Sequence, residues 1–249
     1  MTSENLKERL NLISTQWSLV RRAQHGSADA TNSAQAQLLQ RYSAAAHRYL
    51  CKVLNDPDAA DEVFQEFALR LVRGDLGGAN PTRGRFRNFV KGTLFHLISD
   101  YRKQRGKWPG PLPANSAGLM DIPEERESDR QFVESWCDEL LARAWAALAD
   151  SDAQNQQFFF AVLRFRADHP HLRSPQMAEQ LAVQLGKPFT AAAVRQILHR
   201  AREKFAELLL DEVIHSLEDP TVEQVEQELV ELSLLDYCRP ALGRHGLKV

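Results

Sequence analysis

The sequence predicts an all-α protein with two small helical domains joined by a linker and followed by a helical C-terminal extension. Apolar residues recur at the three- and four-residue spacing of helices along most of the chain, and no stretch alternates with the two-residue period of a strand. Between the two helical blocks, segment 108–128 is rich in Pro, Gly, Asn and Ser and has no period. A chain of 249 residues has room for two such domains, each with a modest core.

Composition argues against a membrane or disulfide-bonded protein. No apolar run approaches the roughly 20 residues of a membrane helix, and MTSENLKERL at the N-terminus lacks the basic start and apolar core of a signal peptide. Cys51, Cys137 and Cys238 are far apart and form no CxxC pair, so neither a zinc site nor a disulfide framework is indicated. We therefore expect a cytoplasmic protein with reduced thiols and no membrane contact.

Charge is unevenly distributed along the chain although the formal net charge is only −2. Basic residues gather at 83–107 and 195–204, and acidic residues gather at 121–129 and 211–236. Because local fields steer nucleic acids more than the net charge does, the two basic segments are candidate nucleic-acid contacts.

The first domain is expected to contain helices at 17–23 and 36–54, and Asn55-Asp56-Pro57 should end the second and cap the next. In that next helix, a core stripe is formed by Phe64, Phe67, Ala68 and Leu71. The opposite side surrounds one outward leucine with acidic and amide groups, which suits a partner protein, and it consists of Glu62, Gln65, Glu66, Leu69 and Arg73.

A second helix of this domain carries cations and a ring on its expected outer side. Its inward positions are Phe86, Phe89, Val90, Leu94, Leu97 and Tyr101, and its outward positions are Arg87, Lys91, Phe95, Ser99 and Arg102. Cations attract phosphates and an exposed ring stacks on bases, a combination typical of single-strand binding. Taken alone, Phe95 and His96 are better interpreted as packing residues than as DNA contacts.

The second domain should hold a helix-turn-helix after helices at 130–149 and 153–167. Ser174 is expected to cap a helix that has Pro175 at its first position, 186–189 forms the turn, and Thr190 caps the next helix. That last helix has an inward face of Val194, Ile197, Leu198, Ala201, Phe205 and Leu208, and an outward face that includes Arg195, Gln196, His199 and Arg202. Arg and Gln can read guanine and adenine in the major groove, whereas the alternative is a solvated helix face.

Two sequence blocks resemble those of a known family. DPDAADEVFQEFALRLV followed by GRFRNFVKGTLFHLISDYRK resembles region 2 of the sigma-70 family in its extracytoplasmic-function form, and AVRQILHRAREKFAELL resembles region 4. The WSLV start together with GRFRNF and HRAREKFAELLLDEV resembles a planctomycete-type subset. The resemblance implies a sigma factor that binds core RNA polymerase and directs promoter recognition, DNA melting and initiation, with no catalytic residues, cofactor or metal of its own. It also allows an anti-sigma or other regulatory protein as a partner.

Matched residue by residue, the resemblance divides the chain into a region 2-like domain (16–107), a linker (108–128), a region 4-like domain (129–212) and an acidic extension (213–249). It implies polymerase contacts at Asp61, Glu62, Gln65, Glu66 and Leu69. It implies −10 DNA contacts at Arg87, Lys91, Phe95, His96, Arg102 and Lys103, with Asp100 nearby. It implies −35 DNA contacts at Thr190, Arg195, Gln196, His199, Arg200 and Arg202.

The acidic extension allows two interpretations. Val222, Val225, Leu229, Leu232 and Leu235 give an amphipathic helix, which either docks as a capping helix or folds over the basic recognition helix and restrains DNA binding.

Two other functions compete with initiation. A helix-turn-helix regulator could bind duplex DNA without polymerase and would not need the surface around Leu69. A metal-dependent enzyme could use the i, i+4 carboxylates Glu62 and Glu66, but no second carboxylate motif completes a site.

Overall fold

The computed structural model describes residues 23, 28–73, 86–106, 123–217 and 220–246. All regular secondary structure in these residues is helical, which confirms the all-α prediction. No helix in these ranges combines the length and apolar character needed to cross a bilayer. The expected helix at 17–23 and most of the expected linker lie outside the described residues.

The chain divides into two compact units. The first takes residues up to Glu139 together with Ile214–Pro220, and the second takes Leu140–Val213 and Thr221–Val249. The boundary lies inside a single long helix, α6 (Pro123–Asn155), rather than at the expected linker. Residues 123–128 of that linker are helical, because Pro123 suits a first helical position and the Glu and Arg residues after it are good helix formers.

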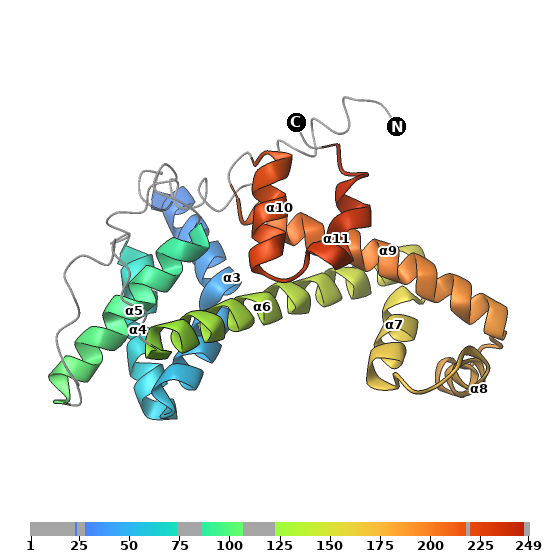
Figure 1. Cartoon of the computed structure of the whole chain (residues 1–249), viewed down its shortest axis with the longest axis horizontal. Helices are drawn as coiled ribbons and strands as arrows, with labels where there is room; N and C mark the ends of the chain where they lie inside the picture. Colours follow the sequence, from blue (N-terminus) through green and yellow to red (C-terminus); the bar gives the residue numbers. More distant parts are fainter. Residues whose placement is uncertain (1–22, 24–27, 74–85, 107–122, 218–219, 247–249) are drawn as a thin grey trace. The chain divides into compact units, whose positions relative to one another are not determined.

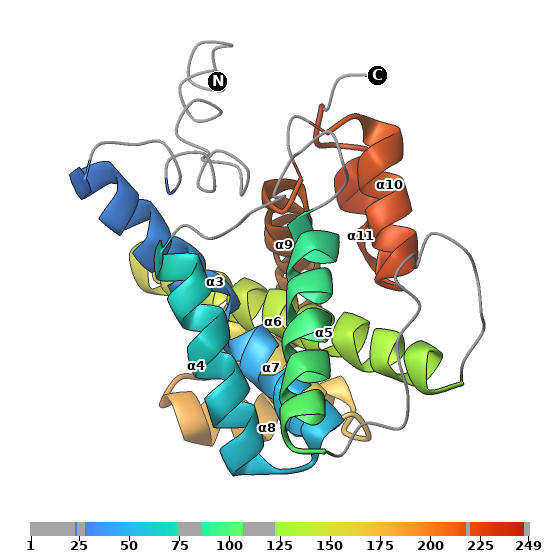
Figure 2. The same ribbon diagram turned by 90° about the vertical axis from the view of Figure 1, so that its left-hand side faces the viewer.

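Unit 1 is a bundle of α3 (Ala28–Leu54), α4 (Pro57–Arg73), α5 (Phe86–Gln104) and the first part of α6. Figures 1 and 2 show α3, α4 and α5 beside one another. The bundle buries large side chains from each of these helices, among them Leu38, Tyr49, Phe67, Leu94 and Phe132. The burial of these apolar surfaces supplies the main stabilisation of the bundle.

The connection between α3 and α4 forms as predicted. Asn55 adopts a left-handed conformation with φ of 49° and ends α3. The carboxylate of Asp56 accepts a hydrogen bond from the Ala59 N–H at 3.1 Å, and Pro57 starts α4.

Aromatic side chains fix α6 to α3. Trp136 stacks on Tyr42 with ring centroids 5.1 Å apart, and Phe132 meets Tyr49 edge-on at 5.3 Å. The Tyr49 hydroxyl also lies 2.7 Å from the Ser128 hydroxyl. The first part of α6 therefore completes the core of unit 1.

Unit 2 contains the rest of α6, α7 (Phe159–Asp168), α8 (Ser174–Leu185), most of α9 (Ala191–His215), α10 (Val222–Glu231) and α11 (Leu235–Leu242). Helices α8 and α9 form the predicted helix-turn-helix, at the right of Figure 1. Gly186 ends α8 in the left-handed conformation with φ of 63°. The Thr190 hydroxyl accepts the Ala193 N–H at 3.1 Å, so Thr190 caps α9 as predicted.

The start of α8 differs from the prediction. The N-cap is Arg173 rather than Ser174, so that Ser174 is the first helical residue and Pro175 the second. The Gln176 side chain compensates by accepting the Arg173 backbone N–H at 2.9 Å. Proline is tolerated at either of the first two positions because neither N–H has an intrahelical partner.

Candidate nucleic-acid and partner interfaces

The first half of α9 presents a polar face to solvent. Val194, Leu198 and Ala201 are buried, and this burial holds the opposite face outward. The outward side chains are all exposed, and they are Arg195, Gln196, His199, Arg200 and Arg202. Thr190 is also exposed, although its hydroxyl already caps the helix.

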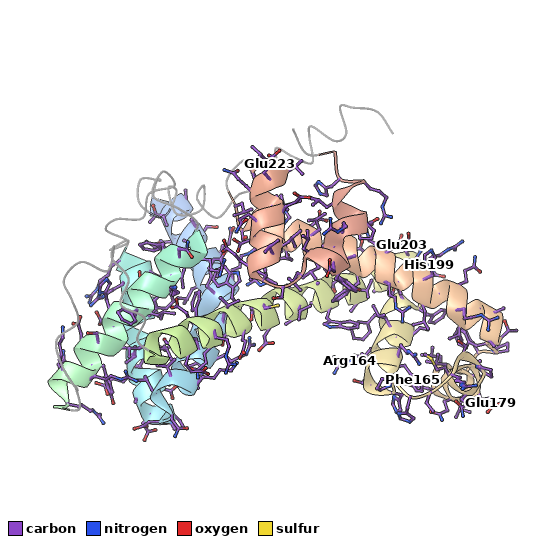
Figure 3. All side chains as sticks on the ribbon, in the orientation of Figure 1. Arg164, Phe165, Glu179, His199, Glu203 and Glu223 are labelled. Carbon is purple, nitrogen blue, oxygen red and sulfur yellow. The ribbon has the colours of Figure 1, made fainter. Side chains whose placement is uncertain are left out.

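Charge changes sign along this face of α9. Within the described part of the chain, no carboxylate lies within ion-pair distance of Arg195, Arg200 or Arg202. His199 is 76% exposed and lies 3.7 Å from Glu203, the first carboxylate of the helix. Both residues are labelled in Figure 3. The uncompensated cations therefore lie in the half of the helix that would meet DNA.

The C-terminal extension docks on the second half of α9. Tyr237 of α11 packs on Phe205 with centroids 6.0 Å apart, and Cys238, Ala241 and Leu242 are buried. Burial raises the pKa of the Tyr237 phenol, with Cys238 acting in the same direction and the Arg202 charge opposing it. The prediction of an amphipathic docked helix is thus confirmed, in the form of two short helices rather than one.

The charges at this contact are the reverse of those that the autoinhibition hypothesis requires. Basic side chains of the extension meet acidic side chains of α9: Arg244 lies 3.4 Å from Glu203 and 3.3 Å from Glu207, and His245 lies 3.0 Å from Asp211. The side chains of α9 that were predicted to contact DNA remain exposed with the extension in place. The hypothesis of an acidic cover over the recognition helix is therefore wrong for this conformation.

The expected partner surface of α4 is exposed as predicted. Asp61, Glu62, Gln65 and Glu66 are exposed, and the outward leucine, Leu69, is 45% exposed. The core side of α4 holds Ala59, Ala60, Val63, Phe67 and Leu71. Of the predicted core stripe, Phe67 and Leu71 are thus buried, whereas Phe64 and Ala68 are only half-buried. A large apolar side chain surrounded by acidic and amide groups is therefore available to a partner.

Each carboxylate on this surface has a basic neighbour that the sequence did not identify. Asp61 lies 2.7 Å from His47, Glu62 lies 3.3 Å from Arg105, and Glu66 lies 2.9 Å from Arg70. Ion pairs this exposed contribute little to stability, so basic side chains of a partner could take the place of these neighbours. No group of three or more His, Cys, Asp or Glu side chains within the described ranges could hold a metal ion.

Arg87 does not lie on the outer side of α5, which corrects the prediction. Its side chain is only 4% exposed. Arg87 precedes Val90 and Leu94 by three and seven positions, so it shares the helical phase of the buried stripe. Ser99, which was also expected to face outward, is buried as well. Arg87 is therefore unavailable to DNA in this conformation.

Three further residues of the predicted −10 surface already have partners. Lys91 forms an ion pair with Asp129 of α6 at 2.9 Å, Arg102 donates to the Val53 carbonyl at 3.3 Å, and Lys103 lies 3.9 Å from Asp100 of its own helix. His96 and Lys103 are exposed, and Phe95 is half-buried beside His96 with ring centroids 6.3 Å apart. The structure thus brings His96, Phe95 and Lys103 to the surface of one helix without assembling all six predicted residues.

Comparison with protein-family models, curated proteins and solved structures found no match for this chain. The functional argument consequently depends on the residues and their geometry.

Proposed function

We propose that this protein is an RNA polymerase sigma factor of the extracytoplasmic-function type, with a region 2-like unit 1 and a region 4-like unit 2. The observation that carries the proposal is the exposed surface of α4, where Leu69 lies among Asp61, Glu62, Gln65 and Glu66. A duplex DNA reader alone would not need this surface. A dissociable factor that must bind polymerase does.

Helix α9 supports the DNA-binding part of the proposal. Its capped N-terminal half carries Arg195, Gln196 and Arg200 on an exposed side, where a recognition helix contacts base edges. In this role Arg195 and Gln196 read the −35 element, and Arg200 contacts the bases or the flanking phosphates.

Promoter melting would depend on α5. His96 and Lys103 are exposed and Phe95 lies next to His96. An unstacked base could stack on the Phe95 ring, and its phosphate could compete with Asp100 for Lys103, which lies 3.9 Å from that carboxylate. Extruding a base costs roughly a few kcal/mol, which stacking and phosphate contacts must offset. Release of Lys91 from Asp129 would add a second cation to this surface.

Affinity for core polymerase tests the proposal. We expect the wild-type protein to bind core polymerase, and Leu69→Ala with Glu66→Ala to weaken binding at least about tenfold, as for a central interface residue. The matched control is Val183→Ala with Glu179→Ala, because Val183 is the most exposed large apolar side chain described in unit 2 and Glu179 is an exposed carboxylate. Equal binding by both double variants would remove the basis of the proposal.

A helix-turn-helix regulator that acts without polymerase is the second candidate. It is favoured by the occupied −10 residues, since Arg87 is buried and Lys91 and Arg102 have protein partners, whereas the base-reading face of α9 is complete. Duplex binding that requires Arg195, in a protein with no affinity for polymerase, would select this function.

A further inference from the structure

A basic pocket lies beside the recognition helix in unit 2. Its volume is about 470 Å³, and it is formed by the end of α7, the α7–α8 connection, the start of α8 and one side of α9. Its cationic and imidazole side chains are Arg166, His171, Arg173, Arg195 and Arg202. Glu179 and Glu203, labelled in Figure 3, belong to α8 and α9 but do not line it, and no other carboxylate does.

The four arginines converge without compensating charge. Within the described ranges, no ion pair joins Arg166, Arg173, Arg195 or Arg202 to a carboxylate. Like charges this close repel one another, so the arrangement is unfavourable unless an anion is bound. A set of residues that breaks a local electrostatic rule without compensation indicates a functional site.

Arg173 occupies an unfavourable position for a cation. As the N-cap of α8 it lies at the positive end of the helix dipole, where carboxylates and small hydroxyl residues are preferred. The same helix end favours a bound anion, because its first N–H groups have no partner within the helix. Arg173 and the helix end therefore both act on an anion placed in the pocket.

The floor of the pocket is rigid. Arg166 donates hydrogen bonds to the Leu172 carbonyl and, at 4.0 Å, to the Met177 sulfur, which ties the α7–α8 connection to α7. Met177 and Leu198 are buried beneath it. The guanidinium groups are thus presented from a fixed frame rather than from a free loop.

We propose that this pocket binds a phosphate group. Guanidinium groups match phosphate oxygens with paired N–H donors, and several of them around one site favour a doubly charged anion. The volume exceeds that of a single phosphate, so the group can belong to a larger ester. Its source is either the DNA backbone next to the bases read by α9 or a free phosphorylated compound.

The pocket and the DNA-reading face share two residues, Arg195 and Arg202. A free phosphoanion in the pocket would engage both, so it would compete with DNA, and the competition would be reciprocal. This regulatory consequence rests on the proposed function, whereas phosphate binding itself does not.

The first experiment measures pyrophosphate binding to the full chain by calorimetry, in the absence of DNA and polymerase. Arg173→Ala is the pocket variant, because the hydrogen bond that caps α8 uses the backbone N–H and not the guanidinium. Arg239→Ala is the matched control, since Arg239 is an exposed arginine of α11 that neither lines the pocket nor belongs to the DNA-reading face of α9. We expect pyrophosphate to bind, Arg173→Ala to weaken it at least about tenfold, as for loss of a charge-assisted hydrogen bond, and Arg239→Ala to leave it unchanged.

The second experiment measures the salt dependence of duplex DNA binding by the same proteins. If the DNA backbone supplies the phosphate, Arg173→Ala reduces the slope of log K against log salt by about one, equally for all sequences. If a free phosphoanion is the ligand, the salt slope is the same in wild type and Arg173→Ala, and pyrophosphate weakens DNA binding by wild-type protein more than by Arg173→Ala. Absence of pyrophosphate binding together with an unchanged salt slope in Arg173→Ala overturns the proposal. If the protein binds pyrophosphate through Arg173 but does not bind DNA, the proposed function is contradicted, whereas the proposal that this pocket binds a phosphate group stands.

Discussion

Arg244 holds the C-terminal extension against α9, and replacing it by alanine should loosen that extension. Its guanidinium bridges Glu203 at 3.4 Å and Glu207 at 3.3 Å, two residues one helical turn apart. It lies two residues after the end of α11, beyond the C-cap Gly243, so both ion pairs connect the end of α11 to a different helix.

The size of the effect follows from exposure. The Arg244 side chain is 47% exposed and its two partners are similarly exposed, so each pair contributes only about 0.2–1 kcal/mol. The two pairs share one cation, and we take their joint contribution as about 1 kcal/mol, or roughly a fivefold change in the opening equilibrium of α11. Because both pairs are near water, high salt should remove most of this contribution.

Amide hydrogen exchange measures the opening of α11 directly. We expect Arg244→Ala to reduce protection of the buried residues Cys238, Ala241 and Leu242 about fivefold at low salt, with little change in the first part of α6. Arg239→Ala is the control: among the residues that the structure describes, Arg239 pairs only with Asp236 of the same helix, at 3.8 Å, so its loss does not free α11 from α9. Equal protection in wild type and Arg244→Ala at low salt, or an equal loss in Arg239→Ala, would refute this reasoning.

Three further predictions concern stability, DNA access and pH. Trp136→Ala should lower the free energy of unfolding by about 3–5 kcal/mol in urea denaturation, because Trp136 is 2% exposed and stacks on Tyr42. Trp136→Phe should cost roughly 1–2 kcal/mol, since the indole N–H has no hydrogen-bond partner among the described residues. Similar losses in both variants would contradict the packing argument. Asp129→Ala should free Lys91 and tighten binding of a single-stranded −10 oligonucleotide about two- to fivefold in fluorescence anisotropy. The control Asp138→Ala, which removes an exposed carboxylate of the same helix, should leave this affinity unchanged. Equal affinities of the two variants would exclude Lys91 from the DNA surface. Burial raises the pKa of Asp152, although the backbone N–H groups of Phe160 and Phe159 act in the opposite direction, so the stability that its protonated form contributes is present at low pH and lost as the pH rises. The free energy of unfolding of Asp152→Asn should therefore increase relative to wild type from about pH 4 to pH 7. A constant difference between the two proteins would show that burial does not penalise the Asp152 charge.

The parts of the molecule that depend on local pattern were predictable from the sequence. The core and outer faces of α4 follow from a single amphipathic period, and Thr190 caps α9 through a contact three residues away. The same holds for the end of α3 at Asn55 and Asp56. In each case the determining interaction lies within one helical turn.

Features that depend on tertiary contacts were not predictable. Arg87 is a cation on the apolar stripe of α5, and the predicted division of that helix into an inward and an outward face placed it on the wrong side. Arg244 and Glu203 are 41 positions apart, so the acidic composition of the extension gave no indication that basic residues would make its contact with α9. The basic pocket likewise combines Arg166 and Arg173 with Arg195 and Arg202, and only the latter two were identified from their helix.

Run-off transcription with core polymerase from the source organism and a library of its promoters tests the central claim most directly. The sigma-factor account predicts transcripts from particular promoters that require this protein, disappear with Leu69→Ala plus Glu66→Ala, and change in promoter preference with Gln196→Ala. Those transcripts would also identify the promoter elements read by α5 and α9. If the folded protein binds duplex DNA through Arg195 but supports no transcript from any promoter, initiation is contradicted and regulation without polymerase takes its place.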